Sequence, residues 1–409
     1  MWAGKAMAKQ TKPKKKKKNR TVGQERLLTV LKALCAVVVL LALVVVAAQR
    51  FGNVTFSSIG DSLSSLISGL QRGDGYPYYF EDSSVLFVEP IGSDLFVVTE
   101  NDTYVLDSTA RKSAETQHTY ASPYADSRGG RVLLLEVGGT AYRVQSKSKT
   151  LYEGESAQRL LTGAISENGT VALASRGENA QSSLTVINRN QKEIFKWNCA
   201  SETIVAVGLS DNGKRAAVSV LGAQDGELYT KVHIFDFDYS EPIASFDFEN
   251  TVSGIEFLSE ERVLLTGNRV FAIAENAELT LEEDLSLNTL SAVYSEDGHD
   301  TAAVLSKYGS SASKIVRAYD QNGELLFETE LEESVKGVSC DGRYVSVLTD
   351  SYLYNYDHEG TLVGKAAVDA DSIRPYTDGK NTYVYALGGI KCYETTQTEE
   401  NAQTTSEAG

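Results

Sequence analysis

The hydrophobic positions of this chain form one long continuous run, which is followed by many short ones. No polar side chain occurs between Ala33 and Ala48, and extension of the run back to Leu27 gives 22 residues with two polar interruptions. A helix of that length is about 33 Å long, and a bilayer's hydrocarbon core is about 30 Å thick. The pattern therefore predicts one transmembrane helix over residues 27–48.

A shorter amphipathic pattern follows this run. Apolar residues recur at helical spacing with Ser and Asp between them, and Gly73-Asp74-Gly75 then ends the pattern. The apolar positions are Phe56, Ile59, Leu63, Leu66, Ile67 and Leu70. We expect a juxtamembrane connector over residues 49–75 that contains a short amphipathic helix, lying on the membrane or packed under the main domain.

From Tyr78 onward, short runs of β-favouring residues alternate with polar turns. One turn signal recurs before an apolar strand, and its eight copies begin near positions 93, 126, 166, 210, 259, 295, 339 and 377, at intervals that average about 41 residues. A second strand–turn–strand element, as in residues 316–323 and 353–360, follows within each unit. About four strands in about 40 residues is the period of a β-propeller blade, so the sequence predicts an all-β propeller.

The end of the chain indicates how such a ring would close. The last unit contains three strand-like segments, near residues 374–376, 382–387 and 390–393, whereas Tyr78–Glu81 is a spare strand before the first unit. We expect these two ends to pair and complete the last blade. The prediction is a propeller of eight blades over residues 76–394, with seven blades as the alternative, and a disordered polar tail over residues 395–409.

Charge is divided sharply along the chain. Residues 1–50 contain twelve Lys or Arg and one acidic residue, which leaves 27 basic and 54 acidic residues in the remainder. The positive-inside rule therefore predicts a cytoplasmic tail over residues 1–26 and an extracellular main domain. An acidic main domain also argues against nucleic acid as its partner.

Two other interpretations of the basic N-terminus remain open. The apolar run could be a cleaved signal peptide processed near Val46 and Ala48, although such runs are usually shorter. The basic cluster also resembles a nuclear localisation signal. Beside a spanning helix, contact with anionic lipid is the better interpretation of this cluster, which consists of Lys14, Lys15, Lys16, Lys17 and Lys18.

Catalytic and metal-binding signals are weak. Gly60-Asp61-Ser62-Leu63-Ser64 resembles the first block of the GDSL esterases, but the later blocks that supply the base and the oxyanion donors are missing, so Ser62 is not expected to be catalytic. The Asp-rich string over residues 295–300 lacks the spacing of a calcium loop and is better explained as a turn. We therefore predict no catalytic, cofactor-binding or metal-binding residues.

Cysteine and tyrosine residues are expected to be structural. Cys199, Cys340 and Cys392 are widely spaced and odd in number, which predicts buried apolar thiols, although one pair could form a bridge. Cys35 lies within the apolar run. Tyrosines favour half-buried strand positions, and we give the same explanation to the cluster at Tyr76, Tyr78 and Tyr79, which could alternatively line a face of the ring.

The repeat period, together with the N-terminal anchor, resembles uncharacterised membrane-anchored propeller proteins of Gram-positive bacteria, within the WD-repeat-like and quinoprotein-like superfamily. The resemblance covers residues 76–394 and depends on the period, because the Trp-Asp signature of true WD repeats is absent. It implies a fold and a topology and no particular activity. We expect a non-enzymatic binding or scaffolding module that takes a protein or envelope polymer. The alternative is an enzyme, a lyase, hydrolase or quinone-linked dehydrogenase, with its site in the central funnel.

Overall fold

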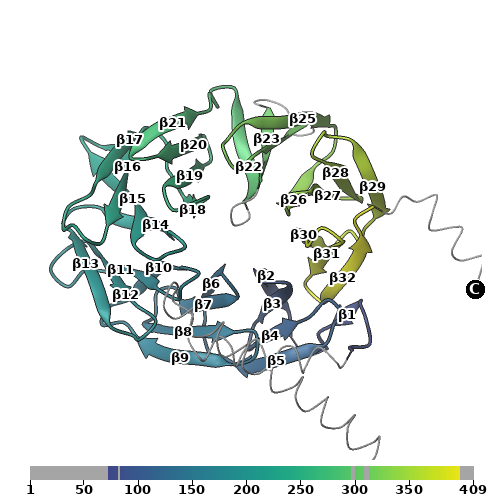
Figure 1. Ribbon diagram of the computed structural model, residues 1–409, viewed down its shortest axis with the longest axis horizontal. Helices are drawn as coiled ribbons and strands as arrows, with labels where there is room; N and C mark the ends of the chain where they lie inside the picture. Colours follow the sequence, from purple (N-terminus) through teal and green to yellow (C-terminus); the bar gives the residue numbers. More distant parts are fainter. Residues whose placement is uncertain (1–71, 82, 296–299, 308–312, 397–409) are drawn as a thin grey trace, which may run out of the picture. The chain divides into compact units, whose positions relative to one another are not determined.

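The computed structural model describes residues 72–81, 83–295, 300–307 and 313–396. Eight antiparallel four-stranded sheets are arranged as the blades of one ring (Figure 1). The predicted fold and the favoured blade number are therefore confirmed, and the seven-bladed alternative is wrong. No helix in the described ranges is long and apolar enough to cross a membrane. Residues 1–71, which include the predicted tail, the spanning helix and nearly all of the connector, lie outside these ranges.

The first four blades follow chain order, with the innermost strand first. Their strands are β2 (Val85–Ile91), β3 (Asp94–Thr99), β4 (Asp102–Leu106) and β5 (Lys112–Gln117); β6 (Pro123–Arg128), β7 (Arg131–Glu136), β8 (Ala141–Ser146) and β9 (Thr150–Glu155); β10 (Leu160–Ile165), β11 (Val171–Arg176), β12 (Ser182–Ile187) and β13 (Glu193–Cys199); β14 (Thr203–Leu209), β15 (Arg215–Gln224), β16 (Glu227–Asp236) and β17 (Ala244–Phe248).

The other four blades repeat this arrangement, and the last one takes its outermost strand from the start of the domain. Their strands are β18 (Gly254–Phe257), β19 (Arg262–Gly267), β20 (Val270–Glu275) and β21 (Glu278–Glu282); β22 (Asn288–Ser295), β23 (Thr301–Lys307), β24 (Lys314–Tyr319) and β25 (Leu325–Leu331); β26 (Val335–Cys340), β27 (Tyr344–Thr349), β28 (Tyr352–Asp357) and β29 (Leu362–Ala367); β30 (Ser372–Thr377), β31 (Asn381–Ala386), β32 (Gly389–Glu394) and β1 (Tyr78–Tyr79).

The last blade closes the ring by pairing the two ends of the domain. Strand β1 is antiparallel to β32, with Tyr78 opposite Ile390 and Tyr79 opposite Gly389. The predicted pairing is therefore confirmed, although the strand is shorter than the expected segment of four residues. The packed chain also extends one residue beyond the predicted boundary at residue 394, because Thr395 is buried and its carbonyl oxygen accepts a hydrogen bond from Asn355 Nδ2 at 2.8 Å.

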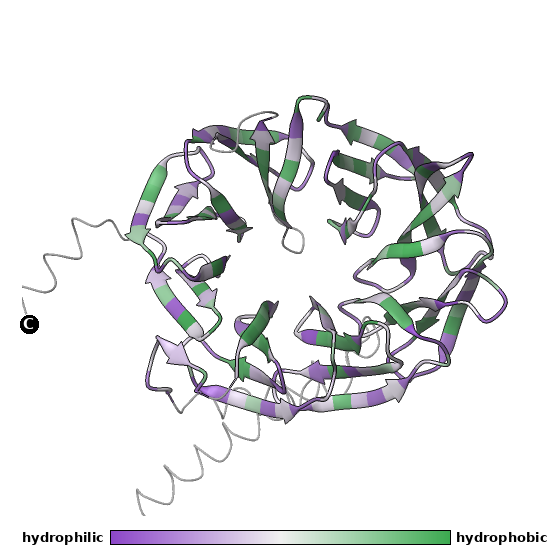
Figure 2. Ribbon diagram, turned by 180° about the vertical axis from the view of Figure 1, so that it is seen from behind, coloured by the Kyte–Doolittle hydropathy of each residue, from purple (hydrophilic) through white to green (hydrophobic). Residues whose placement is uncertain are grey.

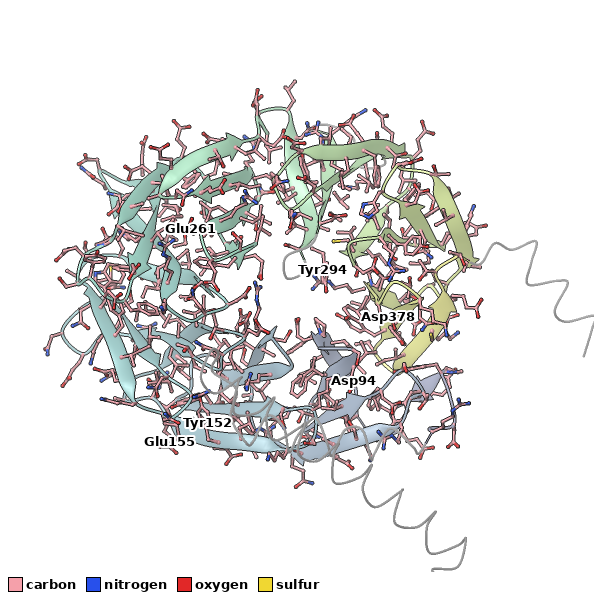
Figure 3. All side chains as sticks on the ribbon, viewed as in Figure 1. Asp94, Tyr152, Glu155, Glu261, Tyr294 and Asp378 are labelled. Carbon is pink, nitrogen blue, oxygen red and sulfur yellow. The ribbon has the colours of Figure 1, made fainter. Side chains whose placement is uncertain are left out.

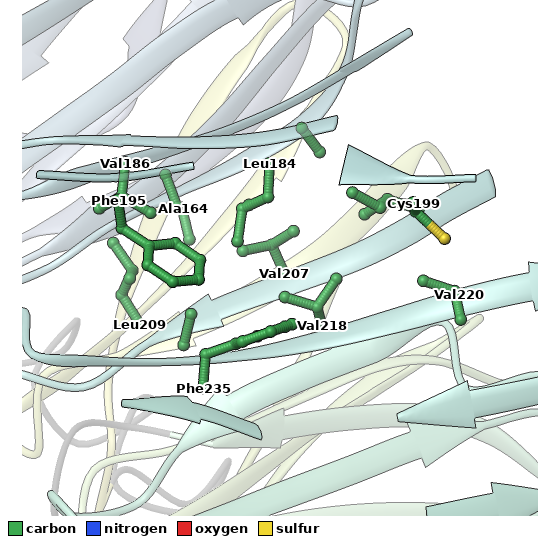
Figure 4. Packing of buried hydrophobic residues seen from close by; sticks show 14 residues of the cluster. Ala164, Leu184, Val186, Phe195, Cys199, Val207, Leu209, Val218, Val220 and Phe235 are labelled. Carbon is green, nitrogen blue, oxygen red and sulfur yellow. The ribbon is translucent and has the colours of Figure 1, made fainter. Parts of the chain in front are cut away.

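The position of a strand within its blade explains its pattern of apolar and polar residues. The middle strands of a blade face a neighbouring blade on each side, so β3 and β7 are buried along almost their whole length. The outermost strands alternate between exposed and covered positions, as β17 does. Hydrophilic and hydrophobic residues accordingly follow one another along the strands at the rim of the ring (Figure 2). The core consists of layers between blades, and in one layer Phe195, Val207 and Phe235 from the third and fourth blades pack together (Figure 4).

The two faces of the ring differ in the connections that they carry. Because the strands of each blade alternate in direction, the segments that join one blade to the next, such as residues 118–122, share a face with the second-to-third strand turns. We call this the connection face. The other face, here called the turn face, carries the first-to-second and third-to-fourth strand turns.

The recurrent turn signal of the sequence lies on the turn face. Its copies coincide with first-to-second strand turns, as at Gly92, Gly129 and Gly342. These glycines have positive φ angles, which side chains with a Cβ atom disfavour, so the repeat signal is the chemistry of one turn used again in successive blades. Residues 296–299, within the string considered as a calcium loop, lie outside the described ranges.

Candidate functional site: ionisable groups at the ring axis and a cleft between two blades

Charged side chains occur on five of the eight innermost strands, which surround the axis of the ring (Figure 1). They are Glu89 on β2, Asp126 and Arg128 on β6, Glu256 on β18, Lys336 on β26 and Arg374 on β30. Electrostatic interactions connect four of these groups in one set: Arg128 interacts with Glu256, and Glu89 interacts with both Arg374 and Glu256. The sequence alone did not point to these residues, because they lie on strands that are far apart in the chain and meet only in the folded ring.

Arg128 connects three blades. Its Nε atom donates a hydrogen bond of 2.7 Å to Asp211 of the fourth blade, and its Nη2 atom donates one of 2.6 Å to the carbonyl oxygen of Phe257 in the fifth blade. Its Nη1 atom contacts the Glu256 carboxylate. The Arg128 side chain is only 4% exposed and belongs to the second blade. The buried positive charge of Arg128 is compensated by two carboxylates and a carbonyl oxygen. We therefore assign Arg128 a structural role, in which it links the second blade to the fourth and fifth.

Glu89 is less well compensated. Burial raises the pKa of its carboxyl group from 4.5 to about 7; the Arg374 guanidinium opposes this shift and Glu256 adds to it. Within the described ranges, Glu89 makes no hydrogen bond or ion pair. Arg374 instead lies near an aromatic ring, with its guanidinium carbon 5.8 Å from the centroid of Tyr294, at the inner end of β22 (Figure 3). The axis therefore contains a carboxyl group that can change its charge near neutral pH.

This arrangement could support proton transfer, because a carboxyl group with a pKa near 7 can act as a general acid or base. The described residues contain no group of three or more His, Cys, Asp or Glu side chains that could hold a metal ion. The chemistry supported by the axis is therefore reversible protonation beside a cation.

The pKa of Glu89 predicts a pH-dependent stability. Between pH 4.5 and 7 the folded state holds a proton that the unfolded state has released, so the free energy of unfolding falls as pH rises through this range and levels off above it. Because Glu89 is partly exposed, we expect a loss of about 2 kcal/mol, less than the full shift implies. Glu89→Gln should match the wild type at pH 5 and exceed it at pH 8. Urea unfolding at both pH values checks this, and an equal difference at both would contradict it.

A cleft with a volume of about 460 Å³ lies between the first two blades. One wall is the start of the connection from β5 to β6, and the other is formed by the adjoining ends of β8 and β9, so the cleft opens on the connection face. Its lining residues are Gln117, His118, Thr119, Tyr120, Ala141, Tyr142, Arg143, Glu153, Gly154 and Glu155. This volume is within the usual range for small-ligand sites.

His118 shapes this cleft as a neutral imidazole. One ring nitrogen, Nε2, lies 3.0 Å from the carbonyl oxygen of Thr99, and the other, Nδ1, accepts a hydrogen bond from the backbone N–H of Tyr120 at 3.3 Å. The first contact requires a proton on Nε2 and the second requires a lone pair on Nδ1. Burial lowers the pKa of His118 further. Because both nitrogens are used, His118 holds the connection in place and is a poor candidate for a catalytic base.

The remaining histidines and the cysteines form no common site. His233 contacts Ser245 Oγ at 2.8 Å, whereas His358 lies 3.0 Å from the Asp300 carboxylate. Cys199, Cys340 and Cys392 are all free thiols, so no pair of them forms a bridge. Burial raises the pKa of the Cys199 thiol to about 11, as expected for a structural residue.

The tyrosine cluster is divided by the fold. Tyr76 packs 5.1 Å from the ring of Tyr383, and Tyr78 lies 5.0 Å from Phe80, whereas Tyr79 is 62% exposed. Two of the three tyrosines therefore have the structural role that we expected. Ser62, Cys35 and His299 lie outside the described ranges.

These features define the molecule as an eight-bladed β-propeller with a charged axis. Residues 78–389 match the profile of DUF5711, a family of unknown function, and the chain belongs to that family. None of the curated proteins compared with the chain matches it.

Solved structures share the fold at low sequence identity. Sqt1 from Chaetomium thermophilum is 13% identical, with a TM-score of 0.53 over 79% of this chain and 100% of its own. Sqt1 bound to the N-terminus of the ribosomal protein L10 is 14% identical, with a TM-score of 0.52 over 77% and 98%. BamB from Moraxella catarrhalis is 11% identical, with a TM-score of 0.49 over 78% and 100%. At these identities the likeness concerns the fold alone.

Proposed function

We propose that this protein is a membrane-tethered extracytoplasmic propeller that acts as a non-enzymatic binding or scaffolding module of the cell envelope, in a Gram-positive bacterium. The apolar run over residues 27–48 supplies the tether, and the Lys-rich segment before it keeps the N-terminus in the cytoplasm and contacts anionic lipid. The propeller supplies a rigid ring whose connections can be varied without loss of the fold. Its ligand is a protein or an envelope polymer.

The observation that carries this proposal is that the chain joins the ring on one face, whereas the cleft opens on the other. The backbone N–H of Gly73 donates to Thr109 Oγ1 at 2.8 Å, and that of Gly75 donates to the Thr109 carbonyl oxygen at 3.1 Å. Thr109 lies in the turn between β4 and β5, so the chain joins the ring at the turn face. The cleft between the first two blades opens on the other face. A ring held from the turn face would leave the connection face accessible to a partner.

The solved structures agree with such a role without requiring it. Sqt1, a propeller of similar fold, is seen bound to the N-terminus of a ribosomal protein. Use of this fold to bind a protein terminus is therefore feasible, and we propose the same general use here.

A second function is favoured by one observation, the raised pKa of Glu89 beside Arg374 at the axis. An enzyme with its site in the central funnel would need such a group. Loss of an activity in Glu89→Gln, with unchanged binding of partners, would favour this alternative.

The test uses the full chain in intact cells. Protease added from outside should digest the propeller and leave the Lys-rich tail protected, and affinity purification from crosslinked membranes should recover a protein or a polymer. If the propeller is protected and the tail is digested, the orientation in the membrane is the opposite of the one that we propose. Recovery of no partner under several conditions would contradict the binding role.

A further inference from the structure

We propose that the cleft between the first two blades binds a short basic peptide segment of a partner protein. This inference rests on the proposed function and specifies the partner's chemistry. The cleft is large enough for one or two side chains with their backbone, and it lies on the face opposite the point where the chain joins the ring. Glu155, at the end of β9, lies at the outer part of this site (Figure 3).

The charge of the cleft favours a cation. Glu153 is 67% exposed and forms an ion pair with Arg143, in which Oε1 lies 3.7 Å from Nη1. Glu155 is exposed and makes no hydrogen bond or ion pair within the part of the chain that the structure describes. His118 adds no positive charge, because both of its nitrogens are used in the neutral form. Two carboxylates thus face one guanidinium that is itself buried, and a ligand's ammonium or guanidinium group would balance them.

Arg143 adds a requirement for a hydrogen-bond acceptor. Its side chain is only 3% exposed; Nη1 donates to the Gln117 carbonyl oxygen at 2.9 Å and Nη2 to Thr103 Oγ1 at 3.4 Å. Its Nε–H group is shielded from solvent and has no acceptor among the described residues. An unsatisfied buried donor is costly, and an oxygen brought by a ligand into this wall would remove that cost after a small shift of the guanidinium.

A basic residue within a peptide carries both groups that the cleft lacks. Its side chain supplies the cation for Glu153 and Glu155, and its backbone supplies a carbonyl oxygen for Arg143. Tyr120 lines the same cleft and offers an aromatic surface for the methylene stem of Lys or Arg. An acidic peptide would meet two like charges at the rim, so the chemistry selects a basic segment.

The experiment measures fluorescence anisotropy of a labelled, acetylated hexapeptide of alternating Lys and Gly, with the full chain in detergent micelles. Peptides with Glu or Ser in place of Lys are the ligand controls. We expect binding of the Lys peptide alone. Glu153→Gln with Glu155→Gln should weaken it at least fivefold, and Thr119→Trp, which fills the cleft without a change of charge, should do the same.

The matched control is Glu324→Gln with Glu359→Gln, which removes the same charge from exposed residues on the turn face. This variant should change the affinity less than twofold, and all variants should keep the thermal midpoint of the wild type. If the control variant weakens peptide binding equally, the effect comes from the net charge of the protein and not from this cleft, and the proposal is overturned. Unchanged binding in Thr119→Trp, or preference for the Glu peptide, would also overturn it.

Two further outcomes separate this inference from the proposed function. If membranes yield a partner equally well with the wild type and with Glu153→Gln and Glu155→Gln, the scaffold stands and the assignment of this cleft is wrong. If the Lys peptide binds only after Lys14 to Lys18 are replaced by Gln, the chain's own basic segment occupies the cleft, and a partner peptide does not.

Discussion

A chain that ends at residue 386 is expected to lose the cooperative unfolding of the whole ring. This truncation removes β32, so β1 loses its partner and β31 becomes an open edge. It also removes Ile390, which is 1% exposed and packs with Val85, Leu95 and Tyr383 of the first and last blades. The loss of a strand and its core contacts should exceed about 5 kcal/mol, comparable to the total stability of many domains.

Thermal unfolding followed by circular dichroism checks this expectation. The truncated chain should melt at least about 10 °C below the full chain or show no cooperative transition. The matched control ends after Thr396, which retains the buried Thr395 and its hydrogen bond with Asn355. The control should melt within about 1 °C of the full chain. If the chain ending at residue 386 melts like the full chain, the closure of the ring does not stabilise it.

The second large loss of stability is expected for Arg128→Met. This change removes three interactions that connect the second blade with the fourth and fifth, and leaves the Asp211 and Glu256 carboxylates without this counter-charge. Removal of one partner from a fully buried pair costs about 3–5 kcal/mol, and the partial exposure of the two carboxylates lowers our expectation to about 2–3 kcal/mol. Urea unfolding measures this difference.

Arg131 provides the control for this prediction, because it lies three residues away and makes one exposed hydrogen bond, to the Glu167 carbonyl oxygen at 2.6 Å. Arg131→Met should cost less than about 1 kcal/mol. Adding Asp211→Asn and Glu256→Gln to Arg128→Met should recover part of the lost stability, since the uncompensated charges are then gone. If the two arginine substitutions lower the free energy of unfolding equally, the interactions of Arg128 across the ring do not stabilise the fold more than an exposed hydrogen bond does.

The ring could be predicted from the sequence because its signals are local and repeated. Each first-to-second strand turn needs residues such as Gly129 or Gly342 at a positive φ angle, and the same turn returns once per blade. Closure could also be predicted, since a strand count that leaves three strands at one end and one at the other has a single simple solution. Tyr78 opposite Ile390 is that solution.

The sites could not be predicted because they depend on residues that are far apart in the sequence. Arg128 and Glu256 are separated by 128 positions and meet only across the ring. Two of the innermost strands, β6 and β18, lack the bulge that the other six have near their beginnings, and these two strands carry that pair. The cleft beside Arg143 combines one blade with the connection leaving its neighbour, and no sequence motif marks such a surface.

The central claim is that the connection face engages a partner while the turn face is the side from which the chain is held. Site-specific photocrosslinking in intact cells tests it most directly, with the crosslinking residue placed at Thr119 on the connection face or at Glu359 on the turn face, in the full chain. We predict discrete adducts from Thr119 and none from Glu359. Adducts from Glu359 alone, or from neither position, would contradict this account.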